Sequence, residues 1–158
     1  MARDPRRTIK RKIAPDKRYN SVLVSKFINK MMQDGKKSLA ERLFYGAMDI
    51  VAEKTKKDAL QVFEAALKNV CPNVQVKSRR VGGSNYQIPT EVKGDRKYHY
   101  GMNWLRDAAK ARKGSSYDQL LAAEIIDASN GIGAAAKKRE DTHKMAEANK
   151  AFAHFARY

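Results

Sequence analysis

Apolar residues recur with the period of an α-helix along most of this chain. Val24, Phe27, Ile28 and Met31 stand at positions i, i+3, i+4 and i+7, which places them on one helical face. Similar stripes predict five more helices, at about residues 38–54, 58–71, 98–113, 116–129 and from 134 onward. In the last of these, the residues expected to face inward are Met145, Ala148, Phe152 and Phe155.

Two of the predicted helices carry a capping pattern at their start. Ser38 is followed three residues later by Glu41, a spacing that satisfies the free N–H groups of a first helical turn. Asp58 is followed by Gln61 in the same way. We therefore expect helices to begin at these two positions, and Pro72 to stop the second of them.

The period changes to two around a Gly-Gly pair. Val74 and Val76 alternate with polar neighbours before Gly82-Gly83, and the alternation resumes after it, which predicts a β-hairpin at about residues 73–92. Pro89 falls in the returning strand, and the middle of a sheet does not tolerate proline. The hairpin is therefore expected to project from the helices as a two-stranded ribbon.

Together these patterns predict an all-α (mainly α) fold, a six-helix bundle with one protruding two-stranded β-hairpin. Residues 19–158 are expected to form a single domain. Residues 1–18 carry eight cations and almost no apolar side chains, so they cannot offset the entropy of becoming ordered on their own. We predict that they form a flexible basic N-terminal arm that becomes ordered against a partner.

The charge balance narrows the function classes. Lys and Arg number 33 against 17 Asp and Glu, a formal net charge of +16, which favours a polyanionic partner. Apolar runs are too short to span a membrane. The basic N-terminus lacks the apolar stretch of a secretory signal, although its arginine content is also typical of an organellar transit peptide. We interpret the chain as intracellular, with no membrane partner.

The residues typical of metal sites and catalysis form no recognisable constellation. The single cysteine, Cys71, can form no internal disulfide and is interpreted as a buried hydrophobe, and the three histidines lack zinc-site spacing. His99 and His154 are interpreted as packing or interface residues. We expect no metal, no cofactor, no small-molecule substrate and no enzymatic activity.

The ribbon is the first candidate nucleic-acid contact. Its cations would neutralise phosphates, its glycines would allow close approach of the backbone, and its tyrosine offers a ring for a base or sugar. The alternative is that the glycines only form a turn and the cations only keep an exposed edge soluble. The candidate residues are Lys77, Arg79, Arg80, Gly82, Gly83 and Tyr86.

Other candidates lie on helix ends, on the last helix and in the arm. Lys36 and Lys37 stand at a helix start, where a phosphate could dock, although an ordinary solvated turn is equally favoured. On the last helix, positions 139, 143, 146 and 150 share a face that is expected to point outward, although Glu140 and Asp141 favour a salt-bridged solvated helix. The remaining candidates are Arg112, Lys113, Lys137, Lys138, Arg139, His143, Lys150, Arg3, Arg6, Arg7, Lys10, Arg11 and Lys12.

Three segments carry a resemblance to a known family. DGKKS at 34–38, VKSRRVGGSNYQIP at 76–89 and KKREDTHKMAEANKAFAHF at 137–155 resemble the bacterial or organellar form of small-subunit ribosomal protein seven, in the same order and spacing. Residues 93–100 depart from the family pattern, being less basic and more aromatic.

The resemblance implies a cytoplasmic, primary rRNA-binding protein that nucleates assembly of the head, the 3′ major domain, of the small ribosomal subunit. It also implies a ribbon tip near the tRNA in the exit site, a surface bordering the mRNA exit channel, and neighbouring small-subunit proteins as partners. By motif, the rRNA contacts would include Lys36, Lys37, Arg79, Arg80, the ribbon glycines, Lys137, Lys138, Arg139 and Lys150.

Two other function classes were weighed. A helical body with a basic, proline-containing ribbon is also typical of DNA-architectural proteins, which wedge a base step from the minor groove. Pro89 lies well back from the Gly-Gly tip, which argues against such a wedge. An RNA-modifying enzyme would need a cluster of titratable groups, and the sequence suggests none.

Overall fold

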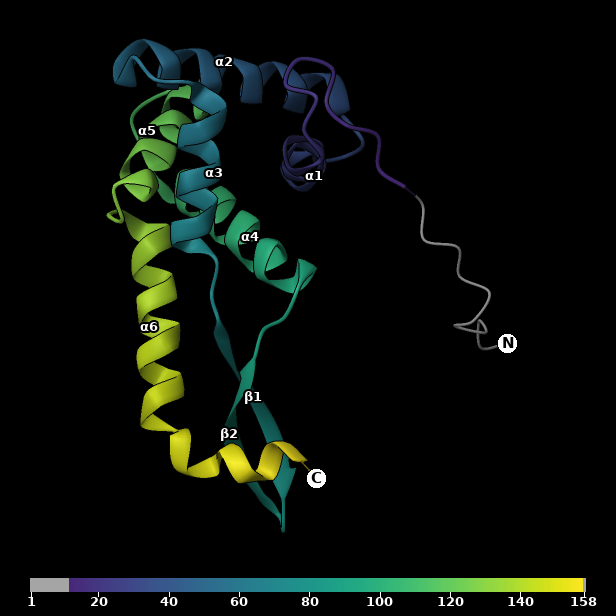
Figure 1. Ribbon diagram of the computed structural model, residues 1–158, viewed down its shortest axis with the longest axis vertical. Helices are drawn as coiled ribbons and strands as arrows, with labels where there is room; N and C mark the ends of the chain where they lie inside the picture. The colour runs from purple at the N-terminus through teal and green to yellow at the C-terminus, as the bar shows by residue number, and fades with distance from the viewer. Residues whose placement is uncertain (1–11, 158) are drawn as a thin grey trace.

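The computed structural model describes residues 12–157, and within them it confirms a mainly helical fold with one β-hairpin (Figure 1). The chain runs through six α-helices, two antiparallel strands and a final 3₁₀ segment. Their bounds are α1 Val22–Met31, α2 Lys37–Thr55, α3 Ala59–Val70, β1 Val74–Val81, β2 Ser84–Glu91, α4 Asp95–Ala111, α5 Tyr117–Ser129, α6 Ala134–Ala148 and η2 Lys150–Arg157.

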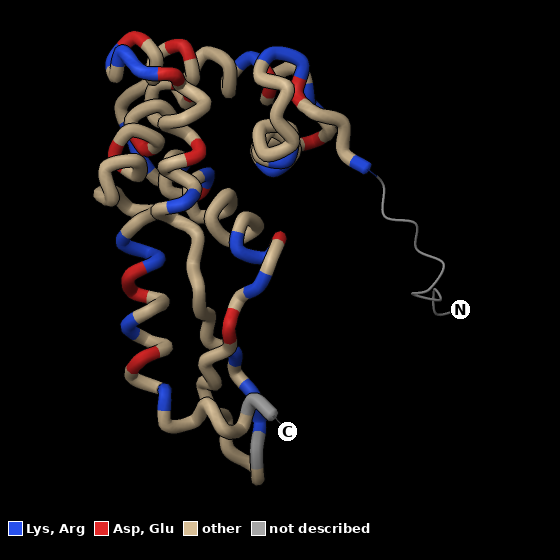
Figure 2. Tube along the Cα trace, viewed as in Figure 1, with Lys and Arg blue, Asp and Glu red and all other residues tan. Residues whose placement is uncertain are grey.

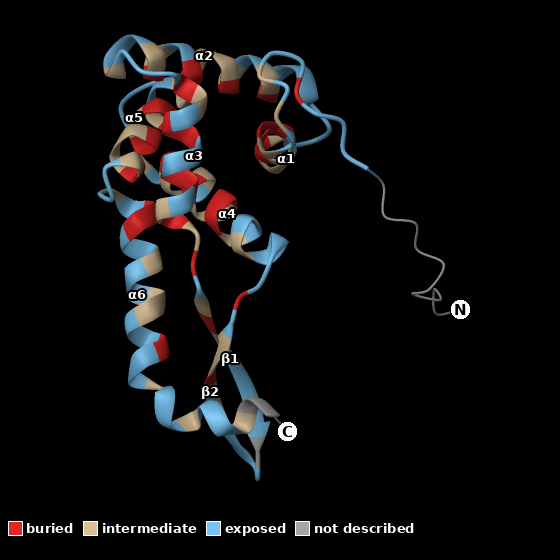
Figure 3. Ribbon diagram, in the orientation of Figure 1, coloured by how far each residue is buried: buried red, intermediate tan, exposed pale blue. Residues whose placement is uncertain are grey.

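A hydrophobic core joins the first five helices, which we call the helical body. Phe27 of α1, Phe44 of α2 and Phe63 of α3 are fully buried, and their ring centroids lie 5.2–5.6 Å apart. Tilted and edge-on pairs of this kind are the favoured aromatic geometries, so three helices are fixed against one another at one point. In Figure 3 the buried residues gather in this part of the molecule.

The two capping predictions had different outcomes. Asp58 is the N-cap of α3, and its Oδ1 accepts a hydrogen bond from the Leu60 N–H at 3.1 Å. The prediction for Ser38 was wrong, because α2 begins at Lys37 with Lys36 as its cap and no side-chain cap bond. Asp34 and Gly35 both adopt positive φ, 52° and 72°, and this tight turn starts the helix before Ser38 is reached.

The predicted hairpin is confirmed as a ribbon that extends away from the helical body (Figure 1). Gly82 and Gly83 form its two-residue loop with φ of 58° and 90°, the conformation that favours glycine in tight hairpins. Arg79 pairs with Tyr86, and Pro89 pairs with Val76. Since the described sheet has only two strands, Pro89 interrupts no further pairing.

Helix α6 and the η2 segment run back along the ribbon. Helix α6 packs against both strands, and η2 lies across β2, where Phe152 and Phe155 sit 5.2 and 5.4 Å from the Tyr86 ring. The prediction that Met145 and Ala148 face inward was wrong, since both are exposed. The α-helical period ends at Ala148, so the aromatic side chains of η2 do not continue the buried face of α6, which is made of Ala135, Ala136 and Ala146.

The described end of the N-terminal segment is attached to α2. The Asp16 carboxylate is buried and accepts hydrogen bonds from the N–H groups of Arg18 and Tyr19 and from the Tyr45 hydroxyl. Arg18 forms an ion pair with Asp49. Residues 1–11 of the predicted arm, including Arg3, Arg6, Arg7, Lys10 and Arg11, lie outside the described residues, and Lys12 is exposed.

Candidate nucleic-acid interface

A basic groove of about 730 Å³ opens between α1, the start of α4 and strand β1. Four cations line it, and we use the name basic groove for the surface they define: Lys26, Lys30, Lys77 and Arg96. Asp95 also lines the groove, and its carboxylate lies 3.2 Å from the Lys26 Nζ. The groove therefore keeps an excess of positive charge, which suits a phosphate backbone.

The atypical segment at 93–100 becomes part of this groove. It forms the first turns of α4, where Tyr98, His99 and Tyr100 line the groove beside the cations. The His99 Nδ1 lies 2.9 Å from the Lys30 Nζ, which links α4 to α1. Burial, followed by the charges of Lys30, Arg106 and Arg96, lowers the pKa of His99, which favours the neutral ring, whose Nδ1 can accept a hydrogen bond from the Lys30 ammonium group.

Sequence reasoning missed Lys26 and Lys30 as candidates, and it left Arg96 out because segment 93–100 departs from the family pattern. Lys26 and Lys30 are spaced i and i+4 on α1, so they stand on one face beside its apolar stripe, and this spacing was a visible signal. Arg96 gave no comparable signal, because its approach to α1 depends on how α4 packs. Lys77, which the sequence did predict, joins these three residues from the ribbon.

The cations of the ribbon point in two directions. Arg79 stands opposite Tyr86 in the register, on the face covered by η2, and its Nη1 donates to the Phe155 carbonyl at 3.3 Å. Arg80 stands opposite Asn85 on the other face and is exposed. The Tyr86 ring is partly covered by Phe152 and Phe155, so less of it is free for a base than the sequence suggested. Gly82 and Gly83 are exposed at the tip.

The basic turn before α2 lies far from the ribbon. Lys36 and Lys37 are exposed, and the Lys37 Nζ reaches the Glu41 carboxylate only at 4.0 Å. Lys36 lines a small cavity of about 290 Å³ together with Arg106 and Lys110. Figure 1 shows α2 at the opposite end of the molecule from the ribbon tip, and Figure 2 shows cations at both ends. The structure therefore does not bring these two candidate sites together.

The prediction that positions 139, 143, 146 and 150 of the last helix form an outward face was wrong for the first three of them. Ala146 on that face is buried, Arg139 and His143 are half-buried, and the His143 Nε2 accepts a hydrogen bond from the Asn73 N–H at 3.1 Å. The reason is that α6 packs its 139–143–146 side against the base of the ribbon. Lys137, Lys138 and Lys150 are exposed, and Lys150 contacts Glu147 at 3.3 Å.

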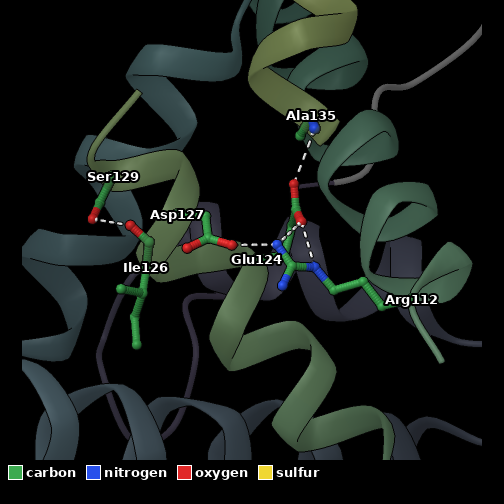
Figure 4. A network of polar contacts seen from close by, with 6 residues as sticks. All are labelled: Arg112, Glu124, Ile126, Asp127, Ser129 and Ala135. Carbon is green, nitrogen blue, oxygen red and sulfur yellow. Dashed lines mark hydrogen bonds and ion pairs between the residues drawn. The ribbon is translucent and has the colours of Figure 1, made fainter. Parts of the chain in front are cut away.

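Arg112 belongs to the internal structure of the protein. Its guanidinium forms ion pairs with Asp127 and with Glu124, whose side chain is fully buried and whose Oε1 accepts a hydrogen bond from the Ala135 N–H at 3.0 Å (Figure 4). Its Nε and Nη2 donors are used by these carboxylates, so Arg112 is less available for the predicted contact with nucleic acid. Lys113, the next residue, is exposed.

Residues typical of catalysis or metal binding stay scattered. Across residues 12–157, no group of three or more His, Cys, Asp or Glu side chains could hold a metal ion. Cys71 packs against Gly101, where an added Cβ would lie 2.7 Å from its Sγ, and burial raises the pKa of its thiol to about 11. The thiol therefore stays protonated, as expected for a packing residue. In the same part of the chain, every helix is too short or too polar to cross a membrane.

Comparison with known proteins gives consistent matches over nearly the whole chain. A family model described as ribosomal protein S7p/S5e matches residues 3–150. The small ribosomal subunit protein uS7 of Chloroflexus aggregans is 57% identical over 155 residues, covering 97% of this chain and 99% of the relative. The proteins of the same name from Carboxydothermus hydrogenoformans and Bordetella pertussis are 58% and 60% identical over 146 residues, covering 92% of this chain and 94% of each relative.

Proposed function

The chain belongs to the ribosomal protein S7p/S5e family, and from this premise we propose that it is a structural, rRNA-binding component of the small ribosomal subunit. Members of this family are structural proteins, and the chain is not an enzyme. The relatives named above are bacterial, so the proposed location is the small subunit in the bacterial cytoplasm.

The basic groove is the observation that carries this proposal. Four cations from α1, α4 and β1 surround a space large enough to admit a nucleic-acid backbone, and aromatic side chains stand between them. Lys and Arg gain affinity for RNA mainly by releasing the counterions condensed on its phosphates. The helices hold these charges at fixed separations, so phosphates of folded RNA can approach one another at reduced electrostatic cost.

The finer roles are also part of the proposal. We infer that the chain is a primary binder that nucleates folding of the head of the subunit, since it presents cations from several remote elements to a single folded RNA. The ribbon extends away from the helical body, a shape that suits contact of its tip with the tRNA in the exit site (Figure 1). Partners would include the mRNA near its exit channel and neighbouring small-subunit proteins.

The DNA-architectural alternative is less well supported. A wedge that opens a base step has to stand at the tip of the inserted element. Pro89 instead pairs with Val76, several residues back from the Gly82–Gly83 loop.

The test is a competition experiment combined with a salt titration. The full chain should bind a 3′ major domain fragment of small-subunit rRNA more tightly than duplex DNA of equal length, and equal affinity would contradict the proposal. Replacing Arg79 and Arg80 with alanine should lower the slope of log affinity against log salt by something under about 2 units. A double variant of the exposed Lys54 and Lys57, at the far end of the helical body, is the matched control and should change the slope less.

A further inference from the structure

The η2 segment, Lys150–Arg157, covers one face of the ribbon (Figure 1). Arg79 and Tyr86 are paired in the register, so both side chains stand on that face. The ring centroids of Phe152 and Phe155 lie 5.2 and 5.4 Å from that of Tyr86. The Arg79 Nη1 also donates a hydrogen bond to the Phe155 carbonyl at 3.3 Å. The segment therefore occupies the aromatic and cationic groups that this face of the ribbon presents.

The covered face combines the two groups that bind single-stranded nucleic acid. A tyrosine ring accepts a stacked base of any sequence, and an arginine beside it pairs with the neighbouring phosphate. Tyr86 is the only aromatic residue of β1 and β2, and the other face presents Arg80 opposite Asn85. Lys77 and Arg80 add positive charge nearby, which favours a nucleobase over an aromatic side chain of a protein partner. A base that stacks on the ribbon therefore has to use the face that η2 covers.

Several features indicate that η2 is held only loosely. Its 3₁₀ form runs over eight residues, whereas the poorer hydrogen-bond geometry of this helix usually limits it to about three or four. Phe152, Phe155 and Tyr86 are all half-buried. Among the side chains that the structure describes, no ion pair joins η2 to the ribbon, and Lys150 contacts Glu147 of α6 instead. The segment can therefore leave the ribbon at a small cost.

The 3₁₀ geometry of η2 matches its docked position. In a 3₁₀-helix, side chains three residues apart stand directly above one another, and the Phe152 and Phe155 rings accordingly lie nearly parallel, at 17°. In the sequence, however, both residues continue the α-helical period of α6, and three of the eight residues of η2 are alanines, which favour an α-helix. A second form is therefore open to the segment, an α-helix that extends α6 away from Tyr86.

We propose that η2 is an autoinhibitory strap, which covers the face of Arg79 and Tyr86 in the free protein and is displaced when a base of single-stranded RNA stacks on Tyr86. The base replaces the two phenylalanine rings, and its phosphate replaces the Phe155 carbonyl as the acceptor for Arg79. The displaced segment then continues α6. The inference rests on the proposed function, and it adds a control over which face of the ribbon is open to RNA.

The first test weakens the strap. Replacing Phe152 and Phe155 with alanine should raise affinity for a short single-stranded oligoribonucleotide about fivefold, the factor expected when about four-fifths of the free protein is closed. The matched control is Met145→Ala, which removes an exposed apolar side chain of α6 and should leave the affinity unchanged. An unchanged or lowered affinity in the double variant would overturn the proposal, since η2 would then be neutral or part of the binding surface.

Two further comparisons identify the source of the gain. Adding Tyr86→Ala to the double variant should remove the gain, because the stacking platform is lost. An oligonucleotide of equal length that lacks bases should show little of the gain, because phosphates alone do not compete with the phenylalanine rings. A full gain in either case would overturn the proposal. The melting temperature of the double variant should stay near that of the wild type, since the fully buried rings lie in the helical body.

The second test observes the strap in the wild-type chain by NMR. In the free protein, the Tyr86 ring protons should show nuclear Overhauser contacts to the rings of Phe152 and Phe155. These contacts should vanish when the oligonucleotide saturates the protein. Within η2, backbone contacts between residues four apart, typical of an α-helix, should replace those between residues two apart. Ring contacts that persist in the saturated complex would overturn the proposal.

The two proposals fail in distinguishable ways. If the wild-type chain shows no preference for the rRNA fragment over duplex DNA, the proposed function fails, whatever happens to η2. If that preference is present but the contacts between Tyr86 and Phe152 survive binding of the oligonucleotide, only the strap proposal fails.

Discussion

The helical body and the ribbon side of this molecule are stabilised in different ways. The body has one continuous core that includes three fully buried phenylalanines. The ribbon side, by which we mean β1, β2, α6 and η2, has few buried residues, and Figure 3 shows it largely exposed. Apart from the buried Ile88 of β2, its contacts include small alanines of α6, single polar bonds such as Asn73 to His143, and half-buried rings around Tyr86.

The difference concerns where the stability of the protein resides. Burial of apolar side chains is the main favourable term in folding, so most of the stability should reside in the body. The ribbon and α6, which have few buried residues, carry several of the cations proposed to contact RNA (Figure 2). The helical body thus holds the fold and also supplies the groove cations Lys26, Lys30 and Arg96, whereas the ribbon side presents its cations with little core beneath them.

The largest expected effect comes from the core. Phe44→Ala should reduce the free energy of unfolding by about 3–5 kcal/mol, because it removes a fully buried ring in contact with Phe27 and Phe63. Phe152→Ala, in the half-buried cluster on the ribbon side, should cost under about 1 kcal/mol. Urea unfolding of both variants measures the difference. Similar losses would mean that the two regions share one core.

The next effect concerns the junction between the regions. Glu124 holds Arg112 and also accepts from the first turn of α6, so Glu124→Gln should destabilise the protein by about 3 kcal/mol. Gly133 adopts a φ of 97°, and a Cβ there would lie 3.0 Å from the Glu124 Oε1, so the chain has little freedom at this point. Glu140→Gln, on the exposed side of α6, is the control, and we expect it to change stability by less than about 0.5 kcal/mol. Thermal unfolding measures both variants.

The smallest effect belongs to the ribbon side and depends on pH. His143→Ala should cost about 1 kcal/mol, because the Asn73 N–H loses its acceptor. Burial and the neighbouring Arg139 lower the pKa of His143 in the folded state. The contribution of the imidazole is therefore complete above its ordinary pKa of about 6.5 and is lost as the pH falls through the folded value.

Urea titrations at pH 7.5 and pH 5 should therefore show a narrowing gap in stability between wild type and His143→Ala as the solution is acidified. Ionisable groups elsewhere are common to both proteins and cancel in the comparison. A gap that widens on acidification would mean that the folded state binds the proton at His143 more tightly than the unfolded chain does.

The candidate site was only partly predictable from sequence, and particular residues show why. Lys36, Lys77, Arg80 and Lys137 were expected to be exposed cations on turns, ribbon and helix, and they are. Arg112 was expected among them, but the carboxylates that hold it lie 12 and 15 residues away on α5. Lys26 and Arg96 were not among the candidates, and they line one groove only because α1 packs against α4.

The sequence by itself determined the helices, the ribbon and its turn, since hydrophobic period, proline and glycine act within a few residues of the chain. It also determined the excess of positive charge and, through three motifs, the family. Only the tertiary structure decided which cations are neutralised internally, which line the groove, and that Arg139 and His143 turn inward. Those outcomes depend on contacts between residues far apart in the chain, which no local pattern specifies.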